Sequence, residues 1–236
     1  MPATKSVSRM ATWVVAASLF MLAPAFAGQK PKEWSPEIDP ANFVSQVDNP
    51  YFPLSPGRSM FYRAETRAGT ETLRIDVMSQ TKIILGVTTT VVIETAALNG
   101  QTIEIAENWF AQDREGNVWY FGEFSRDFEN GVEVGTAGSW EAGVNGARPG
   151  FIMEARPTQG DTYYQEFAPG VAEDMAMVIS ITRTVTVMGR TYSNVLLTKE
   201  WTPLEPNSVE HKSYAPGVGL ITEEKAGVRL ELIEVR

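Results

Sequence analysis

VTTTVVIETAALNG, residues 87–100, is a β-branched run that ends in the dipeptide Asn99-Gly100. β-Branched side chains favour strands, and Asn-Gly between apolar segments is the strongest short signal for a two-residue hairpin turn. The next segment places Ile103, Ile105 and Trp109 at alternating positions, as one face of a following strand requires. This stretch therefore predicts two antiparallel neighbours.

The same alternation continues on both sides of this hairpin. Leu73, Ile75 and Val77 alternate with polar residues before it, and five further strand segments follow near the C-terminus: 178–187, 195–201, 209–214, 220–224 and 228–235. We find no helical apolar stripe of useful length and no internal repeat. The pattern predicts an all-β fold, an antiparallel barrel or a strongly curved sheet.

Composition excludes several classes of function. The 236 residues carry a formal net charge of −9 and include one His and no Cys. An acidic chain is a poor partner for nucleic acid or for anionic membrane surfaces. Without Cys there is no disulfide scaffold, Cys-ligated zinc or iron–sulfur cluster.

The N-terminal sequence predicts where the protein is located. Lys5 and Arg9 precede an apolar run at residues 10–22, and Ala25-Phe26-Ala27 forms an A-x-A cleavage signal. Residues 1–27 are therefore expected to be a signal peptide, with a retained anchor helix as the alternative. No later segment is long and apolar enough to span a bilayer. We expect an exported protein of the periplasm or the extracellular medium that is not an integral membrane protein.

The rest of the chain divides into a leader and one domain. Residues 28–57 form a Pro-rich leader in which 40–47 could be a short helix. Residues 58–236 are expected to form a single β domain with an irregular insert at 125–174. The insert holds eight glycines and nine acids, together with aromatic residues that predict ordered packing over one face of the sheet. A decorated surface loop is the alternative.

Several strings resemble segments of a widespread, uncharacterised family of exported, β-rich bacterial proteins. They are DNPYFPL at 48–54, GNVWYFGE at 116–123, GSWEAGV at 138–144, GARPG at 146–150 and YAPGVGL at 214–220. The resemblance covers most of the chain beyond residue 27. It implies an exported β-rich protein and brings no activity or functional residues with it.

A hairpin between residues 107 and 123 suggests a site. If residues 114–116 form a three-residue connection, paired positions sum to 230, and Trp109 faces Phe121 while Glu107 faces Glu123. Two like charges opposite each other are destabilising unless a cation, an arginine or a shared proton compensates them. If the end of the hairpin overhangs into water, the pair is harmless.

The insert is expected to bring further acids and its anchor Trp140 to this pair, with Arg183 as the compensating charge and His211 as a proton carrier near neutral pH. The candidate ligand-binding residues are Glu107, Trp109, Glu123, Trp140, Glu141, Glu166, Arg183 and His211. The candidate metal ligands are Glu107, Glu123, Glu173 and Asp174. No catalytic residue is assigned.

These residues favour a binding protein. We expect a small-molecule or lipid-like amphiphilic ligand, or a hard divalent cation such as calcium, held between the sheet and the Gly-rich segment. The alternative is an acid–base hydrolase or isomerase that uses the paired carboxylates with His211. A structural or partner-binding role also stays open. No P-loop, G-x-S-x-G or HExxH motif is present.

Overall fold

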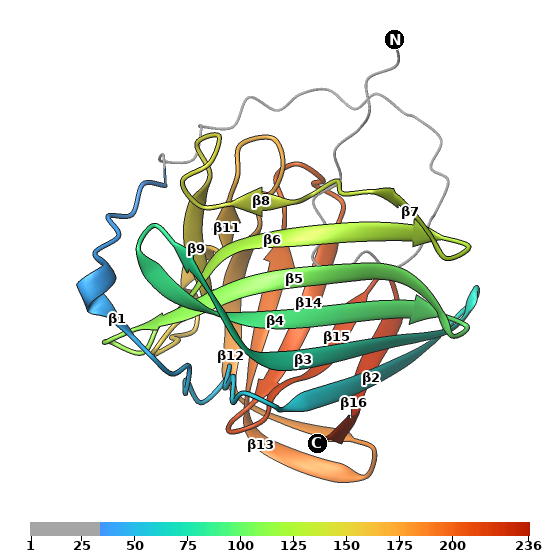
Figure 1. Ribbon diagram of the computed structural model, residues 1–236. Coiled ribbons are helices and arrows are strands. Elements are labelled where there is room, and N and C mark those ends of the chain that lie inside the picture. The colour runs from blue at the N-terminus through green and yellow to red at the C-terminus, as the bar shows by residue number, and fades with distance from the viewer. Residues whose placement is uncertain (1–33) are drawn as a thin grey trace.

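A computed structural model describes residues 34–236, and the predicted signal peptide lies outside these residues. The chain forms a nearly closed antiparallel sheet in which 13 strands follow one another, which confirms the predicted all-β barrel (Figure 1). The order is β10-β12-β13-β14-β15-β16-β2-β3-β4-β5-β6-β9-β11. No helix among residues 34–236 is long and apolar enough to cross a membrane.

Long strands joined by tight turns make up most of the barrel wall. In chain order they are β2 (Ser59–Thr66), β3 (Gly69–Ile84), β4 (Val87–Leu98), β5 (Gln101–Asp113), β6 (Val118–Glu129), β12 (Met175–Val187), β13 (Arg190–Trp201), β14 (Val209–Ala215), β15 (Gly219–Lys225) and β16 (Val228–Val235). Asn99 and Gly100 turn between β4 and β5 with φ of 50° and 79°, the left-handed pair that a type I′ turn needs. The predicted hairpin is confirmed.

The Gly-rich insert builds the part of the wall that closes the barrel. Three short strands, β7 (Val132–Gly135), β8 (Trp140–Glu141) and β9 (Arg148–Met153), pair in succession with β6. Two more, β10 (Thr162–Tyr164) and β11 (Glu166–Phe167), pair with β12 and β9. The insert is thus a series of short wall strands separated by turns, with Trp140 buried as its expected anchor.

The leader closes one end of the barrel. Its predicted helix at 40–47 is wrong beyond one 3-10 turn, η1 (Pro40–Asn42), because Phe43 is already extended and begins β1 (Phe43–Val44), which pairs with β5. Further along, Asn49 is buried and donates its side-chain amide to the carbonyls of Gly116 and Glu154. These bonds fix residues 47–54 across the barrel end.

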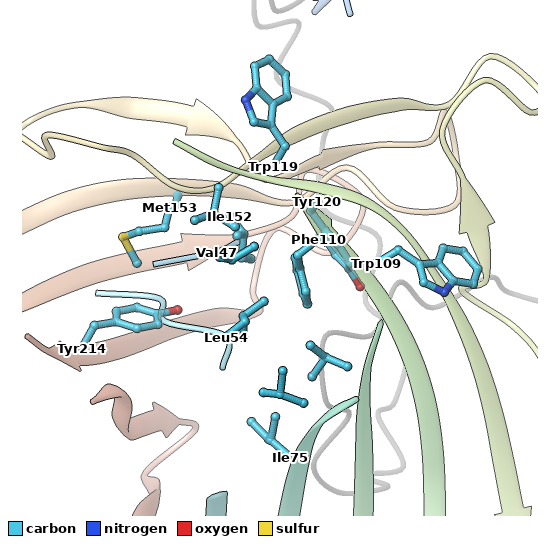
Figure 2. Close-up of a cluster of buried hydrophobic side chains, with 14 of the residues drawn as sticks. Val47, Leu54, Ile75, Trp109, Phe110, Trp119, Tyr120, Ile152, Met153 and Tyr214 are labelled. Carbon is cyan, nitrogen blue, oxygen red and sulfur yellow. The ribbon is translucent and has the colours of Figure 1, made fainter. Parts of the chain in front are cut away.

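Apolar side chains pack on both sides of the wall. Phe110, Tyr120 and Leu54 lie in one cluster, whereas Trp109 and Trp119 point away from it (Figure 2). Other side chains cover these two tryptophans on the outer face of the sheet. The Phe43 ring packs 6.1 Å from Trp119, and Lys82 Nζ lies 3.3 Å from the centre of the Trp109 ring. β5 and β6 are therefore buried on both faces around Trp109 and Trp119, which leaves the interior surface to define the site.

Candidate functional site

A buried lysine stands inside the barrel. Lys212 lies on β14, where side chains alternate between the two faces, so it points inward while its neighbour His211 is exposed. Across the ladders Lys212 faces Glu223 on β15, and one step along β14 Glu210 faces Glu200 on β13. Glu200 and Glu210, whose negative charges would repel each other, therefore lie beside the ammonium group of Lys212.

The distances make Lys212 the centre of this cluster. Its Nζ lies 2.9 Å from Glu200 Oε2, 3.4 Å from Glu210 Oε2 and 3.9 Å from Glu223 Oε2. All four residues are buried. Charges are buried in proteins almost only when they are paired, and here three carboxylates surround one cation, joined by Lys225, which lies 2.5 Å from Glu210.

Burial changes the acidity of these groups. Desolvation raises the pKa of Glu223 to about 8, with Lys212 opposing and Glu210 adding to the rise. Burial by itself lowers the pKa of Lys212, but Glu200, Glu223 and Glu210 together raise it well above its ordinary value. The carboxylates around Lys212 thus favour its ammonium form, whereas burial favours the neutral form of Glu223.

An apolar cavity of about 80 Å³ opens onto this cluster. Glu94, Lys212 and Glu223 contribute its charged part, and Tyr62 and Tyr214 contribute phenol rings. The remaining lining is mainly apolar and comprises Phe52, Pro53, Leu54, Met60, Leu73, Ile75, Val92, Phe110, Ile152, Val218, Gly219 and Leu220. Figure 2 shows Ile75, Phe110, Ile152 and Tyr214 from four different strands, and Leu54 from the leader, around this region.

The leader forms the lid of the cavity. Phe52, Pro53 and Leu54 contribute to its lining, whereas the Gly-rich insert contributes only Ile152. The lid is tied down by Arg58, which donates 2.7 Å to the Val218 carbonyl, and by the amide of Gly217, which donates 2.7 Å to the Pro50 carbonyl. The cavity therefore lies between the sheet and the leader.

A second acidic group occupies the barrel interior beside the first. Burial raises the pKa of Glu123 and of Glu166 well above the ordinary value; the charge of Glu166 adds to the rise at Glu123, and that of Asp174 adds to the rise at Glu166. Asp174 is adjacent to Glu166, and burial raises its pKa to about 6. The Tyr120 hydroxyl donates to Asn108, and Trp140 packs edge-on against the Tyr120 ring at 5.3 Å. Glu123, Trp140, Glu166 and Asp174, four residues selected from the sequence, lie together.

Glu107 and Glu123 do not form the predicted pair. Near the turn the predicted register is correct, since Gln112 pairs with Val118 and Phe110 with Tyr120, but a bulge then shifts the ladder by one residue. Gly122 occupies the bulge with φ of 147° and faces Trp109, so Glu123 faces Asn108 instead. A shift of one residue turns a side chain to the other face, and Glu107 lies outside, accepting a 2.9 Å hydrogen bond from the Trp109 indole.

The other selected residues lie apart from the interior. Glu141 pairs with Lys82 at 2.7 Å on the outer face beside Trp109. Arg183 is exposed on β12, His211 is exposed on the outside of β14, and Glu173 accepts the Gly170 amide at a turn. The structure therefore does not assemble paired carboxylates with His211. Among residues 34–236 no group of three or more His, Asp or Glu side chains has an arrangement that could hold a metal ion.

The sequence analysis missed the central residues, Lys212, Glu223 and Glu94. Charged side chains at alternating positions ordinarily predict a solvated face, and β14 carries a titratable residue on each of its faces in Glu210, His211 and Lys212. The only signal in the sequence was that both faces of this strand carry titratable residues. A strand with one buried face ordinarily carries them on the solvent-exposed face alone.

Comparisons with known proteins add a distant likeness. No model of a protein family matches the chain and no curated protein does, in agreement with the resemblance to an uncharacterised family. A crystal structure of a "putative lipoprotein" from Parabacteroides distasonis is similar over 79% of this chain and 98% of that chain, with a TM-score of 0.43 and 10% sequence identity.

Proposed function

We propose that this chain is an exported binding protein that holds a small amphiphilic molecule in the barrel, beneath the leader. One observation carries the proposal: a mainly apolar cavity beneath the leader is lined on one side by the charged side chains of Glu94, Lys212 and Glu223. Export is supported by the signal-peptide pattern of residues 1–27.

The cavity has the two properties of a small-molecule site. Such sites are concave and mostly apolar, with a few placed polar groups that orient the ligand, as Glu94, Lys212 and Glu223 do here. Its volume of about 80 Å³ is close to half of the 150 Å³ that holds benzene in an engineered cavity. The enclosed part of the ligand is therefore a few heavy atoms, and a longer body would extend past Phe52 at the lid.

The energetic cost of an unfilled cavity gives a second reason. An unfilled cavity costs dispersion contacts, and a buried carboxylate without full hydrogen bonding costs desolvation. Neither cost is needed to close a barrel of this type, because apolar side chains could fill the space. A ligand that occupies the cavity recovers both.

A six-carbon probe tests the proposal. We expect isothermal titration calorimetry with 1-hexanol to detect saturable binding, and Val92→Phe to abolish it, because Val92 is buried and lines the cavity. Ile83→Phe is the matched control, since Ile83 is 71% exposed and lies outside the lining. Equal binding by the Val92→Phe variant would refute the proposal, and so would failure of the unmodified protein to bind 1-hexanol and also its amine and carboxylate analogues of the same chain length. Native mass spectrometry of protein purified from its own host would then identify the natural occupant.

A further inference from the structure

The charged part of the cavity has more acid than base. Lys212 is the one cation in the lining, and Glu200 and Glu210, which do not line the cavity, lie 2.9 and 3.4 Å from it. Glu94 and Glu223 are the two acids that face the cavity itself. The lysine charge is therefore already matched by carboxylates that a ligand does not touch.

One carboxylate oxygen of Glu223 accepts no hydrogen bond. The residue is only 4% exposed, and its Oε1 has no hydrogen-bond partner, while its Oε2 lies 3.9 Å from Lys212, beyond hydrogen-bond distance. Buried carboxylate oxygens are nearly always hydrogen-bonded. Of the ten buried polar side-chain atoms without a hydrogen-bond partner among residues 34–236, this one alone belongs to a residue that lines the cavity, so a ligand in the cavity is the nearest source of the missing donor.

We infer that the cavity takes the ammonium end of a small apolar amine, with Glu223 as its carboxylate partner and Glu94 as the second acid facing it. The inference rests on the proposed function and names the class of its ligand. A primary ammonium group brings three donors and one positive charge, which suits an unpartnered carboxylate oxygen. The methylene groups behind it would lie against apolar lining such as Leu54 and Ile75.

A carboxylate ligand fits this site less well. It would place a negative group beside Glu94 and Glu223 and oppose their ionisation, and it would compete for a lysine that Glu200 and Glu210 already approach. Like charges in a poorly solvated space are strongly unfavourable. A neutral alcohol can donate one hydrogen bond to Glu223 but brings no charge.

The binding of an amine should also displace a proton. Burial raises the pKa of Glu223 to about 8 and that of Glu94 to about 7, so both are partly protonated at pH 7 in the empty protein. An ammonium group favours the ionised forms. The charged and titratable groups around Glu223 are Glu94, Glu200, Glu210, Lys212 and Lys225, with the hydroxyls of Tyr62 and Tyr214.

The experiment compares three probes of one chain length: hexylamine, 1-hexanol and hexanoate. At pH 7 we expect hexylamine to bind at least tenfold more tightly than 1-hexanol, and hexanoate to bind more weakly than both. Repeating the hexylamine titration in buffers of different ionisation enthalpy should show proton release. Val92→Phe should abolish binding of every probe that enters the cavity.

Two variants locate the effect. Glu223→Gln should reduce the affinity for hexylamine about tenfold, to the level of 1-hexanol, and leave 1-hexanol binding unchanged. Glu224→Gln is the control, because Glu224 is the exposed neighbour on the outer face of β15, and it should leave all affinities unchanged. A Glu94→Gln variant gives the same comparison if Glu223→Gln does not fold.

The outcomes separate the two proposals. Equal or tighter binding of 1-hexanol or hexanoate, or hexylamine binding that Glu223→Gln leaves intact, overturns the amine inference while the binding function stands. If none of the three probes binds, the proposed function itself fails. Preference for hexylamine that depends on Glu223 supports both.

Discussion

Lys212 Nζ lies 2.9 Å from Glu200 Oε2 inside a β-barrel, with both side chains buried. A buried ion pair contributes little net stability compared with apolar residues of the same shape, because desolvation offsets the attraction. Removing one partner is different, since the other charge is then left in a site that cannot solvate it. The cluster therefore makes the fold depend on one side chain.

The first prediction is that Lys212→Met lowers the free energy of unfolding by about 3–5 kcal/mol at neutral pH. Glu200, Glu210 and Glu223 would lose the cation that lies within 4 Å of each. Urea denaturation followed by tryptophan fluorescence measures the change. The control is Arg229→Met: Arg229 is 40% exposed by its side chain and pairs with Glu224 and Glu231, so its removal should cost under about 1 kcal/mol. Similar losses for both variants would contradict the central role of Lys212.

The second prediction concerns pH. Burial raises the pKa of Glu94 and Glu154 to about 7, that of Asp174 to about 6 and that of Glu223 to about 8. Between pH 4.5 and 8 the folded protein thus holds protons that the unfolded chain has released, so stability falls as pH rises through this range. Lys212, with a pKa raised above its ordinary value, adds stability that is lost only as the pH rises above the ordinary pKa of a lysine. We expect a lower unfolding midpoint in urea at pH 8.5 than at pH 5.5.

A matched pair of variants checks the cause. Glu123→Gln removes a buried acid whose pKa burial raises well above its ordinary value, so the variant should gain stability over the unmodified protein at pH 8.5 and little at pH 5.5. Glu107→Gln, on the outer face of the neighbouring strand, should leave the pH dependence unchanged. An unfolding midpoint that does not fall from pH 5.5 to 8.5 would show that the interior acids are not the origin.

The third prediction concerns the bulge that separates Glu107 from Glu123. A Cβ on Gly122 would lie 2.6 Å from the Trp140 carbonyl oxygen and 2.9 Å from a carbon of the Trp109 ring. Gly122→Ala should therefore destabilise the protein by about 2 kcal/mol or more through overpacking and backbone strain. Gly131→Ala also has positive φ but meets nothing within 4 Å, so thermal melting should show a clearly smaller loss. Equal losses would assign the effect to backbone conformation alone.

Much of the fold was predictable because its signals are local. The Asn99-Gly100 turn, the alternation of Leu73, Ile75 and Val77, and the final strand at 228–235 depend on neighbours along the chain. The site could not be predicted from the sequence, for two physical reasons. A single bulge at Gly122 placed Glu107 and Glu123 on opposite faces of the sheet, and the inward position of Lys212 depends on barrel closure by distant strands. Local alternation gives the two faces of a strand but does not say which face is enclosed.

The last prediction concerns Trp140 and the insert that closes the barrel. Trp140 is 6% exposed, packs 5.3 Å from the Tyr120 ring and pairs through β8 with Glu123 on β6. Trp140→Ala should cost about 3–5 kcal/mol, as for other buried aromatic residues. The loss should concentrate in the insert, because β7, β8 and β11 are short and depend on β6 and β9 for their pairing.

Limited proteolysis distinguishes this local effect from general unfolding. In the Trp140→Ala variant we expect early cleavage within residues 130–147, while the fragment from β2 to β5 stays protected. Val144→Ala is the control in the same segment, because Val144 is 49% exposed and its removal leaves no cavity. Cleavage spread evenly over the chain would mean that the insert and the long strands unfold together, and an unchanged digestion pattern would mean that Trp140 does not anchor the insert. Because Trp140 also lies beside Glu166, loosening the insert should admit water to the interior acids and weaken the fall in stability between pH 5.5 and 8.5.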